Sequence, residues 1–387
     1  MIILIVYIII LILLICINDN NLEHMVDIPS KPKKKKLKWK RAPYCSYNMT
    51  ETIKKVLDKN NIKETSGDDW TIYIPCSYNY TNKEIKDAQK NIKNKDQRIF
   101  IINNADDITN KCSIWNHLVN KYGRHTSSQL MPKTYCLNSK DDMHLFNIEY
   151  DPKKYYILKK NIQRQEGLKI TNDKKVILNA KNDAFVVVQE LLQNPYIIGG
   201  RKTNMRFYLL LVCRYGEISA YVHNEGFMYY TKVLFKKGDP SDDNNITTGY
   251  IDRKVYEKNP LTLGDLRKYL DDPNRKMYPD ELLLVQQKQK ISIVVMNRIY
   301  ELLTKLVNAM NLIVCSKDKI SENLTFQLFG IDIALNDQLI PQIIEANKGP
   351  DLGAKDGRDG DVKRGVVTDI FRIINTIDGP NNFVKLF

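Results

Sequence analysis

Two carboxylates and one amide interrupt an apolar stretch near the C-terminus, "FGIDIALNDQLIPQIIEANKGPDL", residues 329–352. Asp332 and Glu345 each lie near the end of a segment typical of a buried strand, and Asn347 follows two residues later. If the turn "LNDQL" joins these strands, they pair antiparallel and bring the two acids together. Unpaired buried carboxylates repel each other, and a bound Mg²⁺ relieves that repulsion. Two solvated acids on an edge strand are the alternative.

Basic side chains occur upstream, where apolar strands are expected to end or begin. The segment "YYILKK" ends a strand on Lys159, and "RKTNMRFYLLL" begins one that carries Lys202, Asn204 and Arg206. Because side chains alternate along a strand, the last three share one face. Mg²⁺ with few protein ligands usually accompanies a polyphosphate, and such a face suits phosphate or carboxylate groups. Lysines that merely fringe strand ends are the commoner alternative.

The helices and strands expected around these residues indicate an α+β protein with more than one lobe. The length of 387 residues exceeds one small domain. A basic linker is expected over 18–43, an N-terminal domain over 44–107, a central unit over 108–188 and a C-terminal unit over 189–387. A cleft of nucleotide size between the last two units would bring the acids and the lysines together.

Several elements can be assigned from periodicity. "ITNKCSIWNHLVNKYG" predicts a helix that Gly123 ends. "NMRFYLLLVCRYGEISAYVHNEGFMYYT" predicts a β-meander with a turn at Tyr215-Gly216. Apolar spacing predicts a long helix in "VQQKQKISIVVMNRIYELLTKLVNAMNLI" and a closing helix in "RGVVTDIFRIIN".

The formal net charge of +14 favours an acidic partner, unless a lysine-rich composition alone produces it. No nucleic-acid-binding motif is present, so we expect a protein or membrane partner. The cysteines are odd in number, dispersed and free of CxxC pairs, which argues against disulfides and zinc and favours reduced thiols. Four N-x-T triplets would matter only in a secreted chain. The cysteines are Cys16, Cys45, Cys76, Cys112, Cys136, Cys213 and Cys315, and the triplets begin at Asn48, Asn79, Asn245 and Asn323.

The N-terminus is continuously apolar from Met1 to Ile17, just long enough to cross a bilayer core. No basic residue precedes it, and the lysine-rich run 31–41 follows it. This pattern favours an uncleaved single-pass anchor, residues 1–17, with the folded body facing the cytoplasm. A cleaved signal peptide is the alternative. The lysine run is a solvated linker or rests on anionic lipids, where Trp39 would suit the interface.

Three segments, "VVVQELLQNPYIIGGRKTNMRFYLLLV", "FQLFGIDIALNDQLIPQIIEANKGPDL" and "DVKRGVVTDIF", resemble the tubulin–tyrosine ligase-like family. That family shows a V-V-Q-x-Y-L hinge, an R-K-x-D-x-R strand, an F-G-x-D strand and an I-E-x-N-x-x-P strand in this order. The similarity covers roughly residues 44–387, and the order of several motifs makes it specific. It implies an ATP-grasp fold with a smaller N-terminal α/β domain.

The resemblance also implies roles for single residues. Asp332, Glu345 and Asn347 match the Mg²⁺ ligands of the family, and Lys159 matches the lysine on the α- and β-phosphates of ATP. These four positions would form the metal and phosphate part of the site.

Further positions match the cations and the hinge. Lys202 and Arg206 match cations of the ATP and substrate-carboxylate site, and Arg206 is a candidate to stabilise the acyl phosphate. Lys111 matches a lysine that reaches toward the phosphates. The hinge that would hold adenine, largely through backbone groups, comprises Gln189, Glu190, Leu191 and Leu192.

The sequence departs from the family at several places. Asn204 replaces an Asp near the ribose, and Tyr229 falls near a family arginine. The loop "RQEGL" has Gln165 where the family has a glycine, so its phosphate-loop signal is weak. Residues 246–248, Ile-Thr-Thr, match the family's L-T-N element only in part.

The implied reaction is ATP- and Mg²⁺-dependent joining of a free amino acid to a carboxylate of an acidic protein tail, through an acyl phosphate. Tubulin is the favoured acceptor, which an excess of Lys and Arg would steer. We expect a monomer. The alternative is a catalytically impaired, membrane-anchored protein that binds nucleotide and acidic tails without transfer.

Overall fold

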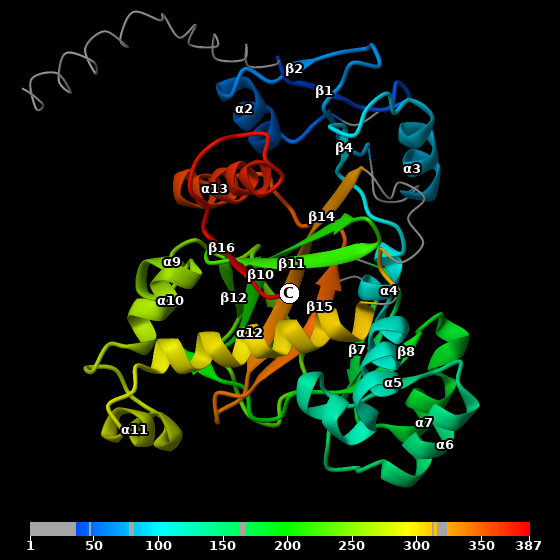
Figure 1. Ribbon diagram of the computed structural model, residues 1–387. Helices are drawn as coiled ribbons and strands as arrows, with labels where there is room; N and C mark the ends of the chain where they lie inside the picture. The colour runs from blue at the N-terminus through cyan, green and yellow to red at the C-terminus, as the bar shows by residue number, and fades with distance from the viewer. Residues whose placement is uncertain (1–35, 46–47, 77–80, 163–166, 312, 316–322) are drawn as a thin grey trace, which may run out of the picture. The chain divides into compact units, whose positions relative to one another are not determined.

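The computed structural model describes residues 36–387 apart from 46–47, 77–80, 163–166, 312 and 316–322. Leu37–Phe387 form one compact unit of mixed helices and strands (Figure 1). Among the helices described, none is sufficiently long and apolar to cross a membrane. The anchor expected over 1–17 lies outside the described residues.

A sheet of twelve strands holds most of the core. Its centre is the antiparallel pair β10 (Arg201–Arg214) and β14 (Leu324–Leu335), whose residues are almost all buried. Leu, Ile, Val and Phe dominate both strands, as a pleated and covered surface favours. The other strands of this sheet are β1 (Lys38–Lys40), β2 (Lys63–Glu64), β3 (Ile72–Tyr73), β4 (Arg98–Ile99), β9 (Ile197–Ile198), β11 (Glu217–His223), β12 (Phe227–Thr231), β13 (Thr247–Thr248), β15 (Pro341–Asn347) and β16 (Phe383–Lys385).

The predicted turn at Tyr215-Gly216 is confirmed, but the β-meander is wrong. β11 and β12 both pair antiparallel with β10, along successive parts of it, and β11 pairs next with β16 instead of β12. Tyr215 and Gly216 have φ of 55° and 77°, the left-handed conformation that a tight two-residue hairpin turn requires. The hairpin of β14 and β15 is confirmed as well, and it brings Asp332 opposite Glu345.

The N-terminal strands extend the same sheet. The order runs β14-β4-β3-β1-β2, and β4 pairs parallel with β14. Strand β1 falls inside the region expected to be a linker, and Trp39 on it is 7% exposed in the main core. The alternative that Trp39 lies at a membrane interface is therefore wrong, because its ring packs inside the fold.

A second, four-stranded antiparallel sheet lies within the central unit, in the order β5 (Thr134–Cys136), β8 (Val187–Glu190), β6 (Tyr156–Lys159), β7 (Leu168–Thr171). It has a small core of its own. Phe146 meets the rings of Tyr135 and Tyr156 edge-on, an arrangement that aromatic pairs prefer. The helices here are α6 (Lys140–Glu149) and α7 (Lys174–Asn179), followed by the 3₁₀ turn Ala180–Asp183.

The predicted helix around residues 108–123 differs from the observed one at both ends. A short helix, α4 (Ala105–Thr109), comes first, and α5 runs over Lys111–Leu130. Asn110 caps α5 with its side chain, which accepts from the N–H groups of Cys112 and Ser113. Gly123, at φ 76°, breaks the helix locally, but helical structure resumes after it.

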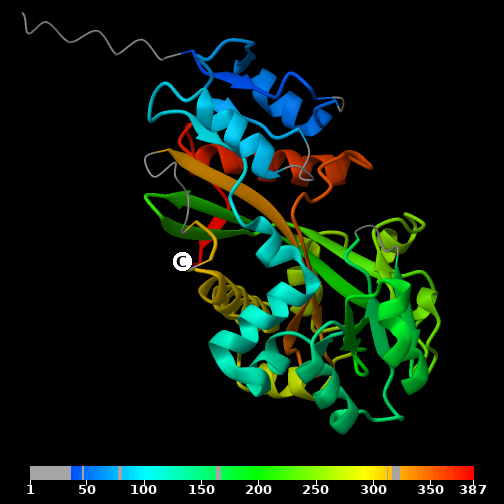
Figure 2. The same cartoon turned by 90° about the vertical axis from the view of Figure 1, so that its right-hand side faces the viewer.

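Two long helices pack against the sheet and its N-terminal extension. α12 (Ile291–Met310) buries one side, and α13 (Gly357–Ile373) packs against α2 (Glu51–Lys59), as Figures 1 and 2 both show. α13 begins earlier than predicted, because Asp356 caps it by accepting from the N–H of Asp359. The remaining helices are α3 (Thr81–Lys90), α8 (Asp242–Asn245), α9 (Val255–Lys258), α10 (Leu263–Leu270) and α11 (Pro279–Gln286).

The expectation of reduced thiols is wrong for the described cysteines. All six form disulfides, with Cα–Cα distances of 5.3, 5.7 and 5.5 Å, and Cys16 lies outside the described residues. The partners are 31, 24 and 102 residues apart, so only the tertiary fold brings them together. The pairs are Cys45–Cys76, Cys112–Cys136 and Cys213–Cys315.

Candidate active site

A cavity of about 620 Å³ is lined by both sheets, a size suited to a nucleotide. The central sheet contributes the ends of β6 and β8, and the large sheet contributes β10, β14 and β15. Twelve residues predicted to bind ATP or Mg²⁺ or to act in catalysis line it: Lys111, Lys159, Gln189, Glu190, Leu191, Leu192, Lys202, Asn204, Arg206, Asp332, Glu345 and Asn347.

Asp332 and Glu345 lie opposite each other on β14 and β15, but neither is unpaired. Nε and Nη2 of Arg206 donate to the two Asp332 oxygens at 2.6 and 2.9 Å, a bidentate pair. Lys111 Nζ donates to Glu345 Oε1 at 3.2 Å. Burial alone would lower the pKa of Arg206, but the Asp332 carboxylate outweighs burial and raises it well above its usual value. The protein's own cations therefore hold both carboxylates.

The donor set fits Mg²⁺ that takes the rest of its ligands from phosphate and water. Asp332, Glu345 and Asn347 present oxygens to one cavity. Within the described residues no group of three His, Cys, Asp or Glu side chains could hold a metal by itself. These residues would thus hold Mg²⁺ only together with a polyphosphate, as the ion prefers.

Two buried lysines place positive charge in the cavity. Lys159 and Lys202 are 6% and 5% exposed, and neither forms an ion pair with another described residue. Lys159 Nζ donates to the carbonyl of Ile344 at 3.1 Å. Burial lowers the pKa of each lysine to about 8. A desolvated ammonium without a carboxylate partner is costly, and a bound phosphate would supply the missing charge.

Asn204 and Tyr229 lie beside Arg206 on paired strands. Oδ1 of Asn204 is buried and accepts no hydrogen bond from the described residues, so it is open to a donor such as a ribose hydroxyl. The guanidinium of Arg206 lies over the Tyr229 ring, 5.2 Å from its centroid. Burial raises the pKa of the Tyr229 phenol to about 12, which keeps it protonated.

The hinge residues form the end of β8 and the turn after it. The Gln189 amide donates to Thr134 Oγ1 at 2.8 Å, which fixes its side chain within the central sheet. The N–H groups of Glu190 and Leu191 donate to the carbonyls of Lys133 and Tyr155. These two N–H groups are therefore engaged already and are not free for adenine.

Sequence reasoning missed Lys355, which lines the cavity together with Tyr250 and Asp351. Its Nζ donates to the carbonyl of Gly249 at 3.1 Å and lies 3.9 Å from the centroid of the Tyr250 ring. Burial lowers its pKa. The residue lies in "KGPDLGAKD", the irregular segment between β15 and α13, where periodicity gives no signal. Gln165, predicted in the phosphate loop, lies outside the described residues.

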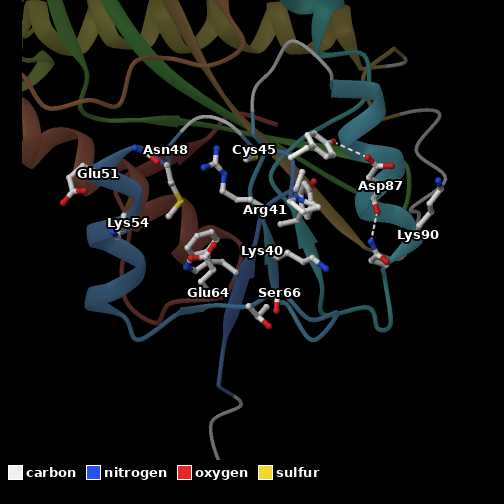
Figure 3. Close-up of a pocket in the computed structure, with 18 residues that line it drawn as sticks. Lys40, Arg41, Cys45, Asn48, Glu51, Lys54, Glu64, Ser66, Asp87 and Lys90 are labelled. Atoms are coloured by element: carbon white, nitrogen blue, oxygen red, sulfur yellow. Dashed lines mark hydrogen bonds between the residues drawn. The ribbon is translucent and has the colours of Figure 1, made fainter.

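A larger cavity, about 1010 Å³, lies elsewhere, between the segment after β1 and helices α2 and α3 (Figure 3). Its lining mixes both charges, with Lys40, Arg41 and Lys54 near Glu51 and Glu64. It contains none of the predicted site residues. Cavity size alone therefore does not identify the candidate site. The smaller cavity is favoured because it contains buried lysines without an ion-pair partner beside carboxylates.

Two sheets with a cleft lined by lysines on one side and acids on the other are consistent with the ATP-grasp fold. The profile of the Tubulin-tyrosine ligase family matches residues 58–382. The chain belongs to this family, as its motifs suggested.

Three relatives illustrate how the chain compares with named members of the family. It is 25% identical to the probable tubulin polyglutamylase ttll-9 of Caenorhabditis elegans, over 94% of this chain and 87% of the relative. It is 24% identical to tubulin polyglutamylase ttll-4 of Caenorhabditis briggsae, over 79% and 51%. It is 25% identical to mouse tubulin polyglutamylase TTLL7, over 52% and 23%. The chain thus spans most of one relative and about half or less of the other two.

Proposed function

We propose that this protein is an ATP- and Mg²⁺-dependent ligase that joins an amino acid to a carboxylate of an acidic protein tail. The single observation that carries the proposal is the pair of buried lysines, Lys159 and Lys202, facing Asp332 and Glu345 across one cavity. Such a distribution suits a polyphosphate bridged to protein carboxylates by a metal.

Different residues along the cavity would bind the phosphates, the ribose and the metal. Lys159 and Lys202 would neutralise the phosphates of ATP, and Asn204 would accept a hydrogen bond from the ribose. Asp332, Glu345 and Asn347 would hold Mg²⁺, which when bound withdraws charge from the phosphoryl oxygens. Lys111, which reaches Glu345 from α5, would steady that carboxylate.

The chemistry proceeds in two displacements. An oxygen of the acceptor carboxylate attacks the γ-phosphorus of ATP, the bond to the bridging oxygen breaks, and ADP leaves. The amine of the donor amino acid then attacks the acyl carbon, the bond from that carbon to the phosphate oxygen breaks, and phosphate leaves with loss of a proton from the nitrogen. Arg206, which pairs with Asp332 and has Tyr229 against its guanidinium, would stabilise the negative charge of the acyl phosphate.

Glutamate is the donor to test first, and a tubulin tail the acceptor, because three relatives are named tubulin polyglutamylases. The net charge of +14 would steer an acidic tail toward the protein.

A second candidate is a binding protein that holds nucleotide and acidic tails without transfer. Tyr229 in place of a family arginine favours it, as does the engagement of Arg206 by Asp332, which leaves fewer donors for substrate.

Transfer of labelled glutamate to tubulin, with ATP binding measured on the same protein, separates the two candidates. Glu345→Gln should lower transfer by about 100-fold or more, because one ligand of the metal is lost. Asp337→Asn makes the same chemical change in the turn of the hairpin, away from the cavity, and should leave transfer unchanged. ATP binding without transfer of any amino acid would support the binding protein and reject the ligase.

A further inference from the structure

Six cysteines, spread over the whole described chain, all find a partner in the fold. Each pair has the Cα separation that disulfides require, between 5.3 and 5.7 Å. Six cysteines can pair in about 15 ways, and a protein with no selection for bridges would leave most of them apart. Complete pairing of the described cysteines therefore indicates a real framework.

Each disulfide joins two segments in a different part of the molecule. Cys45, in the segment that lines the N-terminal cavity (Figure 3), binds Cys76 after β3. Cys213, at the end of β10, binds Cys315 beyond α12. The two residues of this last pair are 2% and 1% exposed, so a reductant would reach them only after local opening.

The third bridge, Cys112–Cys136, adjoins the candidate active site. It ties the first turn of α5 to β5, and Lys111 immediately precedes it in the chain. Lys111 in turn contacts Glu345, while β5 pairs with the hinge strand β8. The bridge thus fixes Lys111, which starts α5 and contacts Glu345 of the large sheet, relative to the hinge strand β8 of the second sheet.

We propose that residues 37–387 mature and act in an oxidising compartment of the secretory route, where three disulfides cross-link them. Structural disulfides persist in such compartments and are reduced in the cytosol. Each bridge forms when two thiols pass two electrons and two protons to a protein disulfide of an oxidoreductase, which becomes a dithiol; two S–H bonds break and one S–S bond forms.

If the protein is the proposed ligase, a location in the secretory route changes which acceptor proteins it can reach. The physiological acceptor is then an acidic protein tail of the secretory route, because cytosolic microtubules lie across a membrane. The tubulin tail of the transfer assay stands in for it as a purified acidic tail. Of the interpretations of Met1–Ile17, the signal peptide agrees with this placement, and a cytoplasm-facing body does not.

The full chain, tagged at its C-terminus, should be expressed in eukaryotic cells and its thiols alkylated at lysis. Mass mapping without reduction should show three linked peptide pairs, and the tag should resist protease in intact microsomes until detergent is added. Alkylation of the six described cysteines in the folded protein, or digestion of the tag without detergent, would overturn the proposal.

Single variants test the pairing itself. Cys112→Ser should free one thiol, located on Cys136, and leave the other two bridges intact. A thiol freed elsewhere by Cys112→Ser contradicts the assignment.

The two proposals fail separately. Oxidised protein that transfers no amino acid to any acidic protein rejects the ligase and leaves the disulfide framework standing. Protein that transfers glutamate with free thiols in the cytosol rejects the framework alone.

Discussion

Lys202 contributes a buried positive charge to the candidate site. It lies in the cavity with Lys159, and neither lysine forms an ion pair with a described residue. Burial lowers the pKa of each to about 8. Both residues are therefore positively charged in neutral solution and become neutral as the pH rises past that value.

ATP binding should consequently weaken above pH 8, because ATP requires the protonated lysines. The Kd should rise by up to about tenfold per pH unit for each lysine that loses its proton. Calorimetric titrations at pH values on both sides of 8 check this. Lys202→Arg, which stays charged, should make the profile shallower; a flat wild-type profile would reject the role of the lysines.

Asn204 supplies a second prediction for a single residue. Its Oδ1 has no partner among the described residues, so Asn204→Ala should not lower the melting temperature. The same change should weaken ATP binding by about 1 kcal/mol, roughly fivefold, because a neutral hydrogen bond is lost. Asn204→Asp keeps an acceptor and serves as the control. Unchanged ATP affinity in Asn204→Ala would remove Asn204 from the site.

Gly226, immediately before β12, allows its strand to pack closely against the backbone of β10 at Arg206. A Cβ on Gly226 would lie 2.1 Å from the carbonyl oxygen of Arg206, a clash with backbone that no side-chain motion relieves. Arg206 holds Asp332, so this contact also sets one wall of the cavity.

Gly226→Ala should therefore destabilise the protein by about 2–4 kcal/mol, as overpacking does. Gly365→Ala is the matched control: this glycine lies within α13 with open space around its Cβ position. Alanine there should stabilise by about 0.5–1 kcal/mol. Denaturant titrations of both variants measure the difference, and equal stabilities would show that the sheet moves to accommodate the new methyl.

For the whole molecule, the disulfides and the continuous sheet determine stability together. The Cys213–Cys315 bridge closes a segment of 102 residues and the Cys112–Cys136 bridge one of 24. A longer closed loop removes more entropy from the unfolded chain.

Replacing both residues of Cys213–Cys315 by alanine should cost about 4–5 kcal/mol, against about 3 kcal/mol for Cys112–Cys136. Chemical denaturation of the two double variants measures the order. The second variant should in addition weaken ATP binding, because Lys111 loses its tether to β5. No loss of stability in either variant would mean that the thiols are not bonded in the native protein.

Local sequence was sufficient for much of the site. Alternation along β10 correctly placed Lys202, Asn204 and Arg206 on one face, and the turn between β14 and β15 brought Asp332 opposite Glu345. Periodicity failed where structure is irregular: it did not reveal Lys355, and it ended α5 too early at Gly123.

The sequence by itself determined the strands, the chemical character of the cavity and the family, because these follow from side-chain alternation and the order of motifs. Only the tertiary structure decided that Arg206 and Lys111 already hold the two acids, that Trp39 is a core residue, and that six cysteines pair. The reason is physical: each of these facts depends on contacts between residues far apart in the chain, which spacing along the sequence does not encode.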